Sequence, residues 1–162
     1  MSDKPQFVYV IYIASSPDKV WRALTDPDMT ARYWLGNRIE SDWKPGSPVT
    51  LTRAKPKVVV SGILLAHEPP RLLSYSFHPE HDGMEREKPS RVTFEVEKQG
   101  DQVKLTVTHD EFEPGSKVFE SISRGWPLTM SSLKSLLETG RTLTANWYQE
   151  KLKREAKQAR QQ

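Results

Sequence analysis

One long stretch near the C-terminal end of this 162-residue chain has the apolar spacing of a single amphipathic helix. Its apolar side chains follow one another at intervals of 3, 4, 4, 3 and 4 residues, which places them on one helical face. They are Phe119, Ile122, Trp126, Met130, Leu133 and Leu137. Gly140 suits a helix C-cap, and Pro127 predicts a break or kink near residues 125–127. A helix with such a face needs a large apolar surface to cover.

That surface is predicted by the residues that precede the helix. Residues 7–13 are all aromatic or β-branched, which favours a strand. Two short helices are expected next, because Ser16-Pro17 and Asp26-Pro27 are typical pairs at helix starts. From residue 36 onward the apolar period changes to two. Further strands are predicted at residues 38–40, 48–53, 57–66, 72–77, 91–97 and 103–112, in an antiparallel meander with tight turns.

Alternation along three of these strands gives each of them one apolar face. The inward positions are Leu73, Tyr75 and Phe77, then Val92, Phe94 and Val96, then Val103, Leu105, Val107 and His109. A sheet with one apolar face must be covered, and the long helix is the available cover. We therefore predict an α+β fold of the helix-grip type. A curved antiparallel sheet surrounds the long C-terminal helix, with two short helices after the first strand.

The distribution of charge separates a domain from a tail. Residues 141–162 contain six basic and two acidic side chains, a net charge of +4, whereas the whole chain carries +3. The first 140 residues therefore carry −1. We expect a helix-grip domain over residues 1–140 and a basic C-terminal helical tail over residues 141–162. The domain lacks the basic face of a nucleic-acid-binding protein, so the charge argues against that class. We expect the tail to be a solvated helix, and the alternative is contact with an acidic partner or nucleic acid.

Composition excludes several other classes of protein. The chain has no cysteine, which excludes disulfides and thiolate chemistry. It has no run of ~18 apolar residues and no apolar signal core, so we expect a cytoplasmic protein without membrane insertion. No Gly-x-Ser-x-Gly motif or glycine-rich phosphate loop is present. These absences argue against a serine hydrolase or a nucleotide-using enzyme, and we expect no cofactor.

Four stretches of the sequence resemble one family. They are residues 13–27 (Ile-Ala-Ser-Ser-Pro-Asp-Lys-Val-Trp-Arg-Ala-Leu-Thr-Asp-Pro), residues 33–36 (Tyr-Trp-Leu-Gly), residues 71–77 (Arg-Leu-Leu-Ser-Tyr-Ser-Phe), and Gly-Trp-Pro at 125–127 with residues 133–140. In this order they resemble the START-like (SRPBCC, helix-grip) superfamily. The branch is the one similar to the C-terminal domain of the activator of heat-shock-protein-90 ATPase. The tail beyond residue 140 departs from that pattern.

The resemblance implies a cavity between the sheet and the long helix. Members of the superfamily bind lipids, sterols, hormones or polyketides there. Others bind protein clients or act as chaperone partners in the stress response, and a few are cyclases or hydrolases. Fold alone does not choose among these functions.

Candidate pocket residues follow from the predicted faces. The expected walls are Trp34, Tyr75, Phe77, Phe94, Trp126 and Met130, and the expected polar anchors are Arg53, His67 and His109. Each of the apolar residues is equally compatible with a plain core position. His109 has two interpretations, as a general base facing the cavity or as a neutral histidine satisfied by its neighbours.

A polar connection holds a second group of titratable residues, His78, Glu80, His81 and Asp82. Histidine and carboxylate at short spacing are found in metal sites. Pro79 and Gly83 make this segment a loop, so we predict a solvated loop and no metal. A connection of this length also suits a lid over the pocket.

Three functions remain open. The leading hypothesis is binding of a hydrophobic small molecule or lipid in the cavity. The second is a protein-interaction or co-chaperone module that uses the exposed sheet face or the basic tail. The third is a cyclase- or hydrolase-like enzyme with His109 as the base, although the sequence favours a binding protein over an enzyme.

Overall fold

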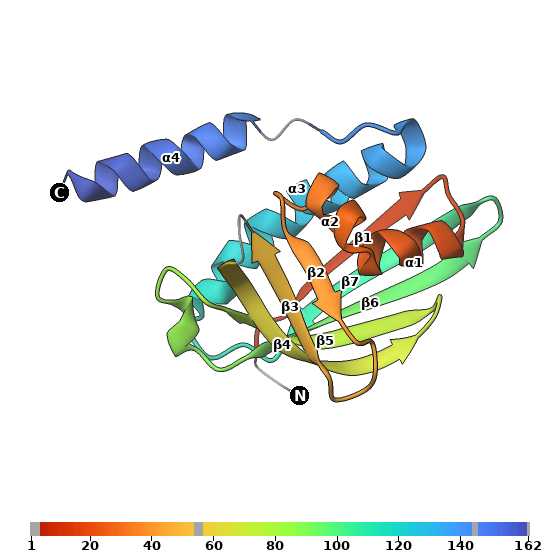
Figure 1. The fold of residues 1–162 in the computed structure, drawn as a ribbon, viewed down its shortest axis with the longest axis horizontal. Coiled ribbons are helices and arrows are strands. Elements are labelled where there is room, and N and C mark those ends of the chain that lie inside the picture. Colours follow the sequence, from red (N-terminus) through yellow and green to blue (C-terminus); the bar gives the residue numbers. More distant parts are fainter. Residues whose placement is uncertain (1–3, 54–56, 144–145, 162) are drawn as a thin grey trace.

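The structure is a computed structural model that describes residues 4–53, 57–143 and 146–161 (Figure 1). In chain order its elements are β1 (Phe7–Ile13), α1 (Pro17–Thr25), α2 (Pro27–Tyr33), β2 (Arg38–Ser41), β3 (Pro48–Arg53), β4 (Lys57–Glu68), β5 (Leu72–Pro79), the 3₁₀ turn η1 (Met84–Arg86), β6 (Ser90–Gln99), β7 (Gln102–Asp110), α3 (Lys117–Thr139) and α4 (Asn146–Arg160). This order confirms the predicted α+β helix-grip fold.

The seven strands form one antiparallel sheet in the order β1-β7-β6-β5-β4-β3-β2. Strands β2 to β7 follow one another as a meander, and β1 returns to pair with the last strand along its whole length, from Phe7 opposite His109 to Ile13 opposite Val103. The first and last strands are therefore neighbours. Figure 1 shows the sheet curving beneath α3, with α1 and α2 beside that helix.

Local capping explains where the two short helices begin. The Ser16 hydroxyl accepts a hydrogen bond from the Lys19 N–H at 3.3 Å. Asp26 Oδ1 accepts from the Asp28 and Met29 N–H groups at 2.8 and 3.1 Å. These bonds satisfy N–H groups that have no partner inside a helix. Both helix starts agree with the prediction.

Helix α3 is continuous from Lys117 to Thr139 and passes through Pro127. Of the break or kink that the sequence predicts near residues 125–127, the structure shows no break. Ile122, Trp126, Met130 and Leu133 are buried on both sides of Pro127. Their burial on both sides of the proline offsets the helical hydrogen bond that Pro127 cannot donate. The helix ends at Gly140, which has φ +81°, as the sequence predicts.

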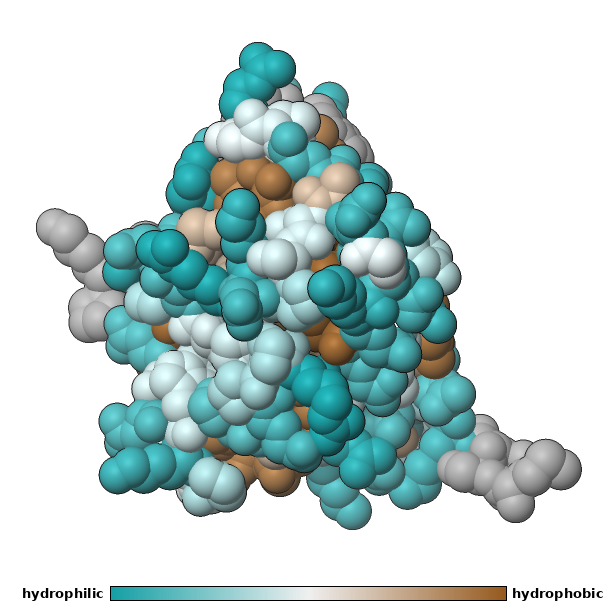
Figure 2. All heavy atoms as spheres, turned by 90° about the vertical axis from the view of Figure 1, so that its right-hand side faces the viewer, coloured by the Kyte–Doolittle hydropathy of each residue, from teal (hydrophilic) through white to brown (hydrophobic). Residues whose placement is uncertain are grey.

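The core fills the space between α3 and the middle of the sheet. All ten predicted inward positions on β5, β6 and β7 are buried. Tyr75, Phe94, Met130 and Leu133 are among the largest side chains that are fully buried. The view in Figure 2 shows a mostly hydrophilic outer surface on which hydrophobic residues appear in separate patches. The space between α3 and the middle of the sheet is therefore filled by side chains, so a ligand cavity must lie elsewhere.

Helix α4 lies apart from the body of the domain in Figure 1. Each of its side chains whose exposure the structure describes is exposed, including Lys151, Lys153, Arg154, Lys157 and Arg160. Among the described residues, no helix is long and apolar enough to cross a membrane.

Candidate ligand-binding pocket

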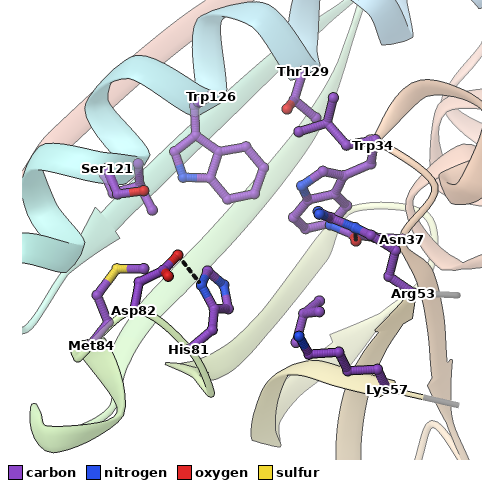
Figure 3. A pocket seen from close by; sticks show the side chains of 14 residues that line it. Trp34, Asn37, Arg53, Lys57, His81, Asp82, Met84, Ser121, Trp126 and Thr129 are labelled. Atoms are coloured by element: carbon purple, nitrogen blue, oxygen red, sulfur yellow. Dashed lines mark hydrogen bonds and ion pairs between the residues drawn. The ribbon is translucent and has the colours of Figure 1, made fainter. Parts of the chain in front are cut away.

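A cavity of about 380 Å³ lies at one end of the grip, beside the first half of α3 (Figure 3). Four segments supply its lining. They are the α2–β2 connection (Trp34, Leu35, Asn37), the facing ends of β3 and β4 (Arg53, Lys57, Val59), the loop after β5 (His81, Asp82, Met84) and α3 (Ser121, Ile122, Gly125, Trp126, Thr129). A volume of this size is within the range of small-molecule sites.

Two tryptophans form the apolar part of the pocket. Trp34 is the C-cap residue that follows α2, Trp126 lies on α3, and their ring centroids are 5.1 Å apart. Figure 3 shows the two indole rings side by side at the edge of the cavity. Both rings are nearly buried, as are Val59, Met84 and Ile122. Only a small part of each ring therefore faces the cavity, because Trp34 is 9% exposed and Trp126 is 2% exposed.

The polar part of the pocket carries more positive than negative groups. Arg53 Nε donates to Oδ1 of the buried Asn37 at 2.9 Å, which orients the guanidinium. Lys57 is exposed beside it at the start of β4. His81 lies 2.8 Å from Asp82 Oδ2, a contact drawn in Figure 3. Arg53 and Lys57 together outweigh the carboxylate of Asp82.

The loop that carries His81 and Met84 is tied to the fold at both ends. On the β5 side, His78 Nδ1 lies 2.6 Å from Glu80 Oε1 and His78 Nε2 lies 2.9 Å from the Glu85 carbonyl. On the α3 side, the Glu87 carboxylate accepts from the Lys117 N–H at 2.9 Å. A carboxylate at a helix N-terminus is favourable. The predicted lid segment thus lines the pocket and is hydrogen-bonded to the fold on both sides.

The neighbours of His78 raise its pKa. Partial burial by itself lowers the pKa, but the hydrogen bond to Glu80, the Glu85 carbonyl and the charge of Glu80 outweigh it. Both partners of the ring only accept hydrogen bonds, so both ring nitrogens donate. Within the described part of the chain, no group of three or more His, Asp or Glu side chains is arranged to hold a metal ion.

His109 is buried in the core, and both of its ring nitrogens are bonded. Trp126 Nε1 donates to His109 Nδ1 at 3.0 Å, and His109 Nε2 lies 2.7 Å from the Ser90 hydroxyl. Indole N–H only donates, so Nδ1 accepts and the proton sits on Nε2. Burial lowers the pKa of His109 to about 3, and the charge of Asp110 opposes this only weakly. The ring is neutral and has no nitrogen left to take a proton from a substrate.

The structure divides the predicted site residues into three groups. Trp34, Arg53 and Trp126 line the pocket. The second group, Tyr75, Phe77, Phe94, His109 and Met130, is buried in the core, and among the described residues the Tyr75 hydroxyl has no hydrogen-bond partner. His67 lies elsewhere on β4, with ring contacts to Trp21 and Trp43 at 5.5 and 5.7 Å.

Sequence reasoning missed several lining residues. Ser121, Gly125 and Thr129 follow each other at intervals of four on α3, next to the apolar stripe. Small residues at helical spacing leave room beside a helix, and this signal was available in the sequence. Asn37 and Lys57 carry no comparable signal, because they lie at the ends of a short connection and a strand.

Comparison with known proteins identifies the family. Residues 14–138 match the model of the family described as activator of Hsp90 ATPase homolog 1-like protein. No curated protein matches the chain significantly. Many solved structures share the fold, among them protein MLL2253 from Mesorhizobium loti, with 25% identity over 83% of this chain and 97% of that chain and a TM-score of 0.71.

Two further solved structures have informative titles. The Aha1 dimer from Colwellia psychrerythraea is 21% identical over 84% of this chain and 98% of that chain, with a TM-score of 0.68. PFC0360w, an HSP90 activator from Plasmodium falciparum, is 20% identical over 82% and 95%, with a TM-score of 0.66. At these identities the likeness shows the fold alone. The family match covers most of the chain, and so this protein belongs to the activator of Hsp90 ATPase homolog 1-like family.

Proposed function

We propose that this protein binds a hydrophobic small molecule or lipid in the pocket beside the first half of α3. The observation that carries the proposal is a cavity of about 380 Å³ with two indole rings as its apolar wall. Burial of apolar ligand surface is worth about 25 cal/mol per Å².

The rigidity of the wall supports the proposal. Trp126 is held by its hydrogen bond to His109 and by edge contact with Phe94, whose ring centroid lies 5.7 Å away. A preformed wall loses little conformational entropy when a ligand binds.

We also propose a cytoplasmic location for the protein, because the absence of cysteine suits a reducing compartment.

Native mass spectrometry of the full chain purified from its own host tests this function. The expected result is a stoichiometric small molecule that denaturing extraction releases and identifies. Gly125→Leu fills the pocket from α3 and should remove the bound mass. Arg124→Leu adds the same side chain at an adjacent exposed position that does not line the pocket, and should retain it. Two results together would contradict the proposal. The purified protein would carry no ligand, and no added apolar compound would bind the wild type more tightly than it binds Gly125→Leu.

A second candidate function is interaction with a chaperone of the Hsp90 type. Two observations favour it: membership of a family named for Hsp90 ATPase activation, and the exposed apolar side chains on the edge strand β1. Val8, Val10 and Tyr12 are 50%, 45% and 47% exposed. Apolar rows on an edge strand are unusual unless something covers them.

The steady-state ATPase rate of Hsp90 from the same host, measured with and without the full chain, tests this second function. Stimulation should be lost in Val10→Lys and kept in Gly125→Leu, because only the first change alters the exposed row. An unchanged ATPase rate at saturating protein would count against it.

A further inference from the structure

We infer that the ligand of this pocket carries an uncharged carbonyl group, which accepts a hydrogen bond from the side-chain amide of Asn37. The inference rests on the proposed binding function and names the chemical class of the ligand.

Asn37 is a buried residue of the pocket lining that is held by two hydrogen bonds. It is 4% exposed, and its backbone N–H donates to the Trp34 carbonyl at 2.8 Å. Its side-chain Oδ1 accepts from Arg53 Nε at 2.9 Å. A guanidinium nitrogen can only donate, so the amide atom that faces it is the oxygen. The other amide atom is therefore Nδ2, a donor with two N–H groups.

This Nδ2 donor is open to the cavity. Among the described residues it has no hydrogen-bond partner. The buried side-chain atoms without a partner in the described part of the chain are Ser15 Oγ and the Tyr75 hydroxyl, so Asn37 Nδ2 is not sealed from solvent. Figure 3 shows the Asn37 side chain beside the Trp34 ring. A ligand that fills the cavity therefore removes this donor from water.

A second buried polar group of the lining, the Thr129 hydroxyl, is also uncharged and open. Ser123, Ser131 and Thr139 on the same helix each donate to the carbonyl four residues earlier, at 2.7, 2.7 and 2.8 Å. Thr129 is 4% exposed and lines the pocket, and its hydroxyl has no partner among the described residues. The buried polar groups that face the ligand are thus neutral hydrogen-bonding groups.

Desolvation determines which ligand these groups favour. A wholly apolar ligand would leave the Asn37 N–H groups buried without an acceptor, which is unfavourable. A carbonyl oxygen accepts from Nδ2 and replaces the hydrogen bond to water. A carboxylate also accepts, but a single uncharged donor does not offset the cost of removing a charge from water. The arrangement therefore favours a ketone, ester or amide over both a hydrocarbon and an acid.

Titration of the ¹⁵N-labelled full chain with two probes, followed by NMR at pH 7, tests the inference. The probes are 4-phenyl-2-butanone and (3-methylbutyl)benzene, which has the same shape but no carbonyl. Asn37→Asp keeps the acceptor for Arg53 and replaces the Nδ2 donor by an oxygen. We expect it to weaken binding of the ketone at least ~10-fold and to change the affinity for the hydrocarbon by less than about twofold.

A matched control makes the same amide-to-carboxylate change away from the pocket. Gln99 is an exposed residue of β6 that does not line the cavity, and Gln99→Glu should leave the affinity for both probes unchanged. A second measurement needs no variant to fold. In the wild type, the side-chain N–H signals of Asn37 should move downfield when the ketone binds and not when the hydrocarbon binds.

The outcomes separate the inference from the binding function. If Asn37→Asp weakens both probes equally or neither of them, or if the ketone leaves the Asn37 amide signals unmoved, the inference is overturned and the binding function stands. Binding of neither probe to the wild type would overturn both.

Discussion

At the scale of single residues, two histidines acquire opposite protonation behaviour from their surroundings. His109 lies in the core between an indole N–H and a hydroxyl, and burial favours its neutral form. His78 lies near the surface between a carboxylate and a carbonyl, which favour its charged form. Their contributions to stability therefore depend on pH in opposite directions.

The first prediction concerns His109. Its pKa is about 3 in the folded protein and near 6.5 when unfolded, so the unfolded chain gains a proton first as the pH falls. Unfolding free energy of the wild type should therefore fall below pH 6.5 relative to His109→Gln, by up to about 1.4 kcal/mol per pH unit. Urea unfolding of both proteins between pH 7.5 and 4 measures the difference, which also cancels the titration of the other groups.

Nitrogen NMR of the His109 ring provides a check that does not depend on the variant. The proton should stay on Nε2, with Nδ1 as acceptor, throughout pH 5 to 7.5. A ring that titrates near pH 6.5 would refute the assignment of a closed, neutral His109.

The second prediction concerns His78. Its pKa is raised in the folded state, so its contribution to stability is fully present below pH 6.5 and is lost as the pH rises through the raised value. The wild type should lose its stability advantage over His78→Gln as the pH increases from 6 to 9. Chemical denaturation at several pH values measures this. His81→Gln, the same change on the neighbouring loop, is the control, and an advantage independent of pH would contradict the prediction.

At the scale of secondary-structure elements, two glycines differ in what surrounds them. Gly62 lies within β4, and a Cβ placed there would be 1.8 Å from the backbone oxygen of Ser76 on β5. Gly125 lies within α3, and a Cβ there would meet nothing within 4 Å. Gly62 is thus required by the close approach of two strands, whereas Gly125 is tolerated at a cost in helix propensity.

The third prediction follows from this contrast. Gly62→Ala must push two strand backbones apart and should destabilise the protein by more than about 2 kcal/mol. Gly125→Ala should stabilise it by about 0.5–1 kcal/mol, because alanine is the better helix former and has room. Thermal and urea unfolding of the two variants measure both effects. A Gly62→Ala protein of wild-type stability would show that β4 and β5 lie farther apart at this point than in this structure.

At the scale of the whole molecule, the described side chains change from buried to exposed after α3. The end of α3 is held to the domain by Arg32, whose Nη2 donates to the Gly140 carbonyl at 3.1 Å. Beyond it, the side chains of α4 whose exposure is described are exposed. We therefore propose that residues 1–140 are the folding unit. Residues 141–162 would contribute positive charge to the protein but no side chains to its hydrophobic core.

The fourth prediction tests this division. Deletion of residues 146–162 should change the free energy of unfolding by less than about 0.5 kcal/mol, because it removes no described buried side chain. Ligand binding in the pocket should persist, since the lining residues lie outside the tail. Urea unfolding and calorimetry of the shortened chain measure both. A loss of several kcal/mol would show that the tail belongs to the folded core.

Much of the fold could be predicted because it depends on short-range patterns. A period of two placed Leu105, Val107 and His109 on one face of β7, and all three are buried there. The N-cap residues determine where α1 and α2 begin, and Gly140 determines where α3 ends. Each of these features depends on residues only a few positions apart, so the sequence by itself determined them.

The position of the cavity was decided only by the tertiary structure. The alternation of apolar residues predicts which face of the sheet a side chain occupies. It does not predict whether side chains from α3 fill the space above that face. Tyr75, Phe94 and Met130 meet across the grip and are fully buried, whereas Trp34 and Trp126 end beside an opening. Likewise, packing on both sides of Pro127 kept α3 unbroken where the local rule predicts an interruption. These outcomes depend on contacts between residues far apart in the chain, because close packing is a property of the whole assembled core.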